Sequence, residues 1–119
     1  MWCKEKSTSV FPGPKRRSLE MITHIVLIQP KVSTSKEQIL AFLQRVLTLQ
    51  EVIPGILHIS TGENRSVYHK GFTFGIIMRF VDEAHLQAHH THPAHVAVVT
   101  ELDRLCQQSI DFDLLETAL

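Results

Sequence analysis

The sequence is poor in cysteine, in excess charge and in long apolar runs, and each shortage excludes a class of protein. Its 119 residues include only two cysteines, Cys3 and Cys106. One lies in a segment without periodicity and the other on an expected helix, so we predict no disulfide framework and a reducing, cytoplasmic location. The 12 basic and 12 acidic residues balance to a formal charge of zero. Without a basic surplus, nothing in the charge favours binding to nucleic acid or to an anionic membrane.

Apolar runs and ligand-binding motifs are short or missing as well. No apolar stretch approaches the roughly 20 residues that a membrane-spanning helix needs. The chain has no H-E-x-x-H motif, no paired cysteines, no phosphate loop, no dinucleotide fingerprint and no nucleophile elbow. No acidic residue lies between positions 84 and 100 to orient the histidines found there. We therefore expect no specific metal site and no cofactor.

The length of the chain predicts one domain. Residues 1–20 mix basic and small residues without periodicity, and Pro12-Gly13-Pro14 interrupts regular structure there. We interpret them as an extension, followed by a domain over residues 21–115 and a short C-terminal tail over 116–119. Charge and apolar content in the domain are those of an ordinary globular protein.

The pattern of apolar residues predicts strands and helices in the order of a ferredoxin-like α+β fold. Strands are expected over residues 22–29, 56–61, 72–81 and 110–114, and helices over 36–50, 82–89 and 93–107. Ser35 and Gln38 have the spacing of a capping box, and Asp82 can cap the second helix. In the last helix we expect Val96, Val99, Leu102 and Cys106 on one side. This βαββαβ order places the helices on one face of an antiparallel sheet.

The opposite face of that sheet is expected to be apolar too. Ile25 and Leu27 point away from Val26 and Ile28, and Ile77 points away from the neighbouring phenylalanines. A water-exposed sheet face normally carries polar residues. A second copy of the chain is the simplest cover, so the pattern predicts a homodimer with an isologous interface.

Side chains that can exchange protons are concentrated in the segment His89-His90-Thr91-His92-Pro93-Ala94-His95. Imidazole exchanges protons near neutral pH, with an ordinary pKa of about 6.5. Pro93 is typical of a first helical residue, so the segment indicates a junction between two helices. His95 is either a general acid or base over a small pocket or a structural residue that bonds a carbonyl freed at the helix break. His24 shares the strand face of Val26 and Ile28, with the same two alternatives.

These residues resemble the stress-responsive dimeric α/β-barrel (Dabb) family from about Met21 to Leu114. The resemblance is carried by Ile22-Thr23-His24-Ile25-Val26-Leu27, Ile53-Pro54-Gly55-Ile56, Gly71-Phe72-Thr73, His92-Pro93-Ala94-His95-Val96 and Asp111-Phe112-Asp113. It implies a ferredoxin-like subunit whose sheet faces that of a second subunit in a dimeric barrel. It also implies a pocket between the helices and the sheet of each subunit.

One characterised family member, olivetolic acid cyclase, indicates which residues could form that pocket. The resemblance aligns His95 and His24 with two of its pocket histidines, while His89 replaces a tyrosine and Phe74 replaces another histidine. The expected catalytic residues are therefore His95, His89 and His24, and the expected pocket residues are Phe74, Phe72, Ile76, Tyr68 and His92.

The favoured function is binding or transformation of a small hydrophobic or carbonyl compound. If the protein is an enzyme, we expect cyclase- or lyase-like proton transfer next to a carbonyl, assisted by histidine. Two alternatives stay open at this point. One is a non-catalytic stress-associated assembly protein with structural histidines, and the other is a cofactor-free barrel similar to a monooxygenase.

Overall fold

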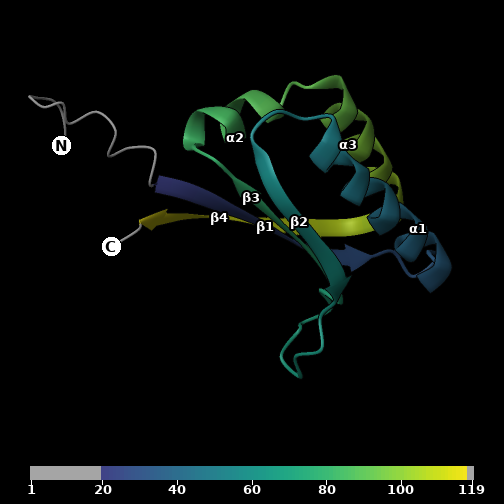
Figure 1. Ribbon diagram of the computed structural model, residues 1–119. Coiled ribbons are helices and arrows are strands. Elements are labelled where there is room, and N and C mark those ends of the chain that lie inside the picture. Colours follow the sequence, from purple (N-terminus) through teal and green to yellow (C-terminus); the bar gives the residue numbers. More distant parts are fainter. Residues whose placement is uncertain (1–19, 118–119) are drawn as a thin grey trace, which may run out of the picture.

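The structure, a computed structural model, describes residues 20–117, with Thr117 described by its backbone alone. One four-stranded antiparallel sheet is covered on one face by the helices (Figure 1). The elements are β1 (Glu20–Pro30), α1 (Lys36–Leu47), a 3₁₀ turn η2 (Thr48–Glu51), β2 (Ile56–Glu63), β3 (Phe74–Phe80), α2 (Glu83–His89), α3 (Pro93–Leu105) and β4 (Cys106–Thr117). The strand order is β2-β3-β1-β4, which is the predicted ferredoxin-like α+β fold.

The two ends of the expected domain meet in this sheet. Glu20 begins β1 and pairs with Thr117, so β4 runs two residues beyond position 115. Most of the expected extension, residues 1–19, lies outside the described residues, together with Cys3 and residues 118–119 of the expected tail. Within residues 20–117 no helix is both long enough and apolar enough to cross a membrane.

Local signals in the sequence define the helix starts. The Ser35 hydroxyl accepts a hydrogen bond from the backbone N–H of Gln38 (3.1 Å), and the Gln38 side chain accepts one from the Ser35 N–H (2.8 Å). The Asp82 carboxylate accepts a hydrogen bond from the His85 N–H (2.9 Å) at the start of α2. Pro93 is the first residue of α3. The predicted capping box, acidic cap and proline start are all confirmed.

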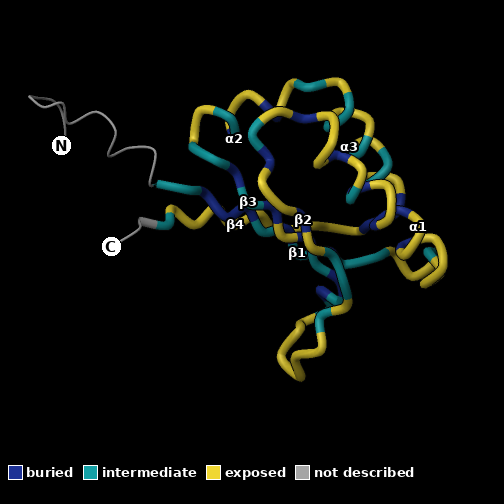
Figure 2. The backbone as a smooth tube through the Cα atoms, in the orientation of Figure 1, coloured by how far each residue is buried: buried dark blue, intermediate teal, exposed yellow. Residues whose placement is uncertain are grey.

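The core lies between the helices and the inner face of the sheet. The predicted alternation in β3 is confirmed, because Phe74, Ile76, Met78 and Phe80 are all buried on this face. On the helix side they meet Ile39, Phe42, Leu43, Val46 and Leu86. Figure 2 shows this burial against the exposed outer sides of the helices. Each fully buried aliphatic or aromatic side chain stabilises the fold by about 1.5–3 kcal/mol.

Several predicted boundaries are wrong, and the predicted face of α3 is right for Leu102 and Cys106 but wrong for Val96. β3 begins at Phe74 instead of Phe72, and α3 ends at Leu105, so Cys106 opens β4 with an extended backbone. The buried side of α3 is formed by Leu105 together with the partly buried Ala94, Val98 and Leu102. Val96 is half exposed.

The outer face of the sheet, which no helix covers, is apolar at its centre. The strand register places on it the side chains of Ile25, Leu27, Ile77, Ile110, Phe112 and Leu114. Phe112 is 54% exposed and Ile77 is 41% exposed in the single chain. A hollow of about 330 Å³ opens beside Ile25, Leu27 and Ile77, next to the end of β2. The predicted second apolar face therefore exists.

Candidate functional site

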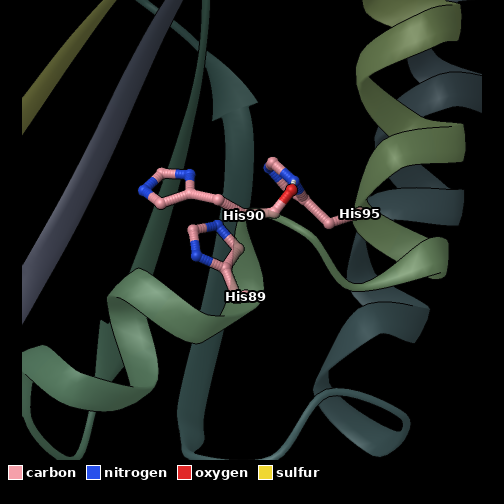
Figure 3. A group of neighbouring side chains, drawn as sticks. All are labelled: His89, His90 and His95. Atoms are coloured by element: carbon pink, nitrogen blue, oxygen red, sulfur yellow. Dashed lines mark hydrogen bonds between the residues drawn. The ribbon is translucent and has the colours of Figure 1, made fainter.

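The fold brings the three predicted catalytic histidines together above the inner face of the sheet. His24 comes from β1, His89 from the end of α2 and His95 from the first turn of α3. The ring centroids of His24 and His89 are 5.6 Å apart, and those of His89 and His95 are 4.2 Å apart. A fourth imidazole, His90, lies 4.6 Å from His89 and 5.9 Å from His95 by the same measure. Figure 3 shows how the α2–α3 junction gathers the rings of His89, His90 and His95.

His24 is buried and paired with a carboxylate that the sequence analysis did not single out. The β1–β4 register places Asp113 opposite His24, and their Nδ1 and Oδ1 atoms are 2.5 Å apart. Because a carboxylate only accepts, Nδ1 of His24 donates the proton, and its Nε2 is the ring nitrogen left for other partners. A carboxylate in this position fixes the tautomer and the orientation of the ring, as in catalytic His–Asp pairs.

His89 is the most deeply buried of the four histidines. Its Nδ1 donates a hydrogen bond to the backbone carbonyl of Leu86, and its Nε2 is buried without a hydrogen-bond partner among residues 20–117. The pKa of His89 is lowered from about 6.5 to about 4, mainly by burial and to a smaller extent by the nearby imidazoles of His95, His90 and His24, while the hydrogen bond to the Leu86 carbonyl opposes the shift. His89 is therefore a neutral imidazole near pH 7, with an unused acceptor facing its neighbours.

His95 is partly exposed and has a similar tautomer. Its Nδ1 donates to the carbonyl of His90 at 3.2 Å, which leaves the lone pair on Nε2. Burial lowers the pKa of His95 below its usual value, and the hydrogen bond to the His90 carbonyl opposes part of that shift. A neutral imidazole with a free Nε2 at a partly open position can act as a base toward a small molecule.

The predicted pocket residues fall into two groups. Phe72, Phe74 and Ile76 are buried on the inner side of the sheet. Tyr68 is 80% exposed in the loop between β2 and β3, which projects away from the helices (Figure 1). His92 caps α3, where its Nδ1 accepts a hydrogen bond from the Ala94 N–H at 3.1 Å. The structure thus brings neither Tyr68 nor His92 into the histidine cluster.

Phe80 and Asp113, which the sequence did not predict as site residues, lie beside the histidines where Tyr68 and His92 were expected. The Phe80 ring lies 4.8 Å from that of His89 and 6.4 Å from that of His24. Its position at the end of the alternating row in β3 was a usable signal. Asp113 lies in the Asp111-Phe112-Asp113 segment that carries the family resemblance, but its pairing with His24 depends on the register of β1 with β4.

Comparison with known proteins agrees with this architecture. A family model, the stress responsive A/B barrel domain (Dabb), matches residues 22–115. The hydroxynitrile lyase from Passiflora edulis is similar in structure, with a TM-score of 0.77 and 19% identity over 85% of this chain and 97% of that chain. An Arabidopsis thaliana protein gives a TM-score of 0.76 and 22% identity, covering 82% of this chain and 97% of its own.

A dimeric ferredoxin-like protein of unknown function from Jannaschia sp. CCS1 is similar as well. Its TM-score is 0.70 at 25% identity, over 79% of this chain and 97% of that chain. No curated protein matches the sequence. Because the family model covers nearly the whole described chain, the protein belongs to the stress-responsive A/B barrel domain (Dabb) family.

Proposed function

We propose that the protein is a homodimer in which each histidine cluster binds a small hydrophobic carbonyl or hydroxyl compound and transfers a proton next to its carbonyl carbon. The observation that carries the proposal is the convergence of His24, His89 and His95, with His24 held by Asp113 at 2.5 Å. Apolar walls with a few convergent polar groups are the usual composition of a small-molecule site.

The hydrogen bonds favour different roles for the three histidines. His95 has a free Nε2 at the most accessible position of the three and is the proposed base. His24 is the proposed acid partner, because the Asp113 carboxylate holds its Nδ1 and leaves its Nε2 to face the substrate. His89 does not protonate readily, given its pKa of about 4, so it orients the substrate through Nε2 and does not act as an acid.

A lyase reaction suits this set of groups. The base removes the hydroxyl proton of a hydroxynitrile, the carbon–carbon bond to the nitrile breaks, and cyanide leaves with a proton supplied by the acid. The products are a carbonyl compound and hydrogen cyanide, and the step needs no oxidant or reductant. The similar Passiflora edulis protein is a hydroxynitrile lyase, which supports this class for the shared fold.

The dimer and the compartment are parts of the same proposal. The apolar outer face supports pairing through the sheets, and similar structures are described as dimeric. Such burial offsets the entropy of association when several aliphatic side chains are covered. Cys106 is a buried free thiol, which fits the reducing cytoplasmic location expected from the sequence.

The test uses mandelonitrile, an aromatic hydroxynitrile, and its product benzaldehyde as probes. We expect His95→Ala to lower the rate of mandelonitrile cleavage by about 100-fold or more, since a positioned acid or base contributes about 10²–10⁴-fold. His58→Ala is the matched control, because His58 is exposed on β2 and bonds only Ser60. Binding of benzaldehyde is followed by NMR on the histidine ring protons.

Two results would overturn the catalytic proposal. One is equal cleavage by His95→Ala and His58→Ala. The other is a wild-type protein that neither cleaves mandelonitrile nor binds benzaldehyde, together with a large fall in melting temperature for His95→Ala. The second result would establish the alternative of structural histidines, which the buried bond from His89 to the Leu86 carbonyl favours.

A further inference from the structure

We propose that His89, His90 and His95 form a binding site for a divalent transition-metal ion of the zinc type. Each contributes one ring nitrogen, and these nitrogens all lie within 4.8 Å of one another (Figure 3). The sequence analysis expected no specific metal site, because no acidic residue lies near these histidines along the chain. The proposed site shares His89 and His95 with the proposed function, so a bound ion would take their Nε2 lone pairs and block proton transfer, but its test uses the metal alone and requires no substrate.

An independent observation points to a ligand at this position. Nε2 of His89 is buried with no hydrogen-bond partner among the described residues, although His89 is only 1% exposed. A buried acceptor without a partner disfavours the folded state unless something binds it. Because Nδ1 of His89 already donates to the Leu86 carbonyl, the unused atom is a lone pair and suits a cation.

The surrounding hydrogen bonds resemble those of established metal sites. Histidine ligands usually donate their second ring nitrogen to a backbone carbonyl or a carboxylate, which fixes the ring and its tautomer. Nδ1 of His89 donates to the carbonyl of Leu86, and Nδ1 of His95 donates to the carbonyl of His90. Two of the three proposed ligands are therefore oriented before any ion binds.

To bind an ion, the three ligand nitrogens need to move only a short distance toward one another. Nitrogen ligands about 2.0–2.1 Å from a tetrahedral zinc ion lie roughly 3.3 Å apart. The ligand nitrogens are somewhat wider apart than this, and His90 is the exposed member whose side chain can rotate inward. Its position in the three-residue link between α2 and α3 leaves it outside both helices.

The donor set and the charges around it select the class of ion. Three imidazole ligands favour zinc, copper and nickel over calcium or magnesium, which prefer oxygen ligands. Asp111 acts electrostatically on His95, and Asp113 pairs with His24 beside the cluster. Both carboxylates favour a bound cation. Three protein ligands leave a fourth position for water on the exposed side.

The test is a titration of untagged, EDTA-treated protein with zinc chloride, followed by calorimetry. We expect one zinc ion per chain and a rise in melting temperature with added zinc. His90→Ala should weaken zinc binding by about 100-fold or more, since even indirect disturbance of a ligand costs about 10–100-fold. This variant keeps the His90 carbonyl that orients His95, and its exposed side chain makes unfolding an unlikely cause of the loss.

His69→Ala is the matched control, because His69 lies in the exposed loop between β2 and β3. Substituted cobalt gives a second readout, through visible absorption bands that change when an imidazole ligand is lost. The proposal is overturned if the wild-type protein binds no zinc, or if His90→Ala and His69→Ala bind it equally. Neither result bears on mandelonitrile cleavage, so the two proposals fail separately.

Discussion

At the scale of single residues, Asp113 decides how His24 presents its ring nitrogens. We expect Asp113→Asn to reverse the His24 tautomer in part of the molecules, because an amide can donate to Nδ1 where a carboxylate can only accept. The tautomer is measured from the ¹⁵N chemical shifts of the ring. Asp103→Asn, on the exposed side of α3, is the control. An unchanged His24 spectrum in Asp113→Asn would show that the pair does not form in solution.

Cys106 gives a second prediction at this scale, for its thiol chemistry. The pKa of the Cys106 thiol is raised to about 11, mainly by burial and also by the negative charge of Asp103, while Lys31 opposes the shift. The thiolate is the reactive form, so alkylation by iodoacetamide should be slow at pH 8 and accelerate only as the pH approaches 11. A Cys3→Ser variant leaves one thiol, and mass spectrometry measures its labelling. Rapid labelling at pH 8 would contradict the buried position.

At the scale of elements, the turn between η2 and β2 depends on Gly55. Its φ is +89°, and a Cβ there would lie 2.4 Å from the ring of His85 on α2. We expect Gly55→Ala to destabilise the fold by about 2–4 kcal/mol, through backbone strain and displacement of His85. Urea unfolding measures the change.

Gly71→Ala is the matched control for this turn. Gly71 has the same φ of +89°, but its added Cβ would meet only the flexible end of the Gln29 side chain. We expect a cost of about 1–2 kcal/mol, from the backbone alone. Equal losses for the two variants would show that the contact between the Gly55 turn and α2 contributes nothing.

At the scale of the whole molecule, the outer face predicts how the protein assembles. We expect Phe112→Asp to convert a dimer into monomers at micromolar concentration, with at least a ~100-fold weaker association, because burying one large side chain contributes about 1.5–3 kcal/mol and a buried charge adds a penalty. Light scattering coupled to size exclusion measures the mass. Val32→Asp is the control, since Val32 is exposed in the β1–α1 loop. A monomeric wild-type protein would refute the interface.

How much could be predicted from the sequence depends on how far apart in the chain the contacting residues lie. Contacts between near neighbours, such as the Ser35 capping box and the β3 alternation, follow from local spacing and were predicted. The end of α3 was missed because Leu105 and Cys106 are both apolar and both buried, so the pattern of apolar residues does not mark the change from helix to strand. Asp113 and the unpaired Nε2 of His89 depend on contacts between distant segments, so no local pattern could indicate them.

The two sides of β4 tie the site to the outer face. Asp111 and Asp113 point toward the histidines, while Ile110, Phe112 and Leu114 alternate with them on the opposite side. Because one backbone carries both sets, docking of a second chain along β4 also restricts where the Asp113 carboxylate can sit. If the proposed dimer and the proposed proton transfer both hold, dilution that separates the subunits would also loosen the position of the Asp113 carboxylate beside His24.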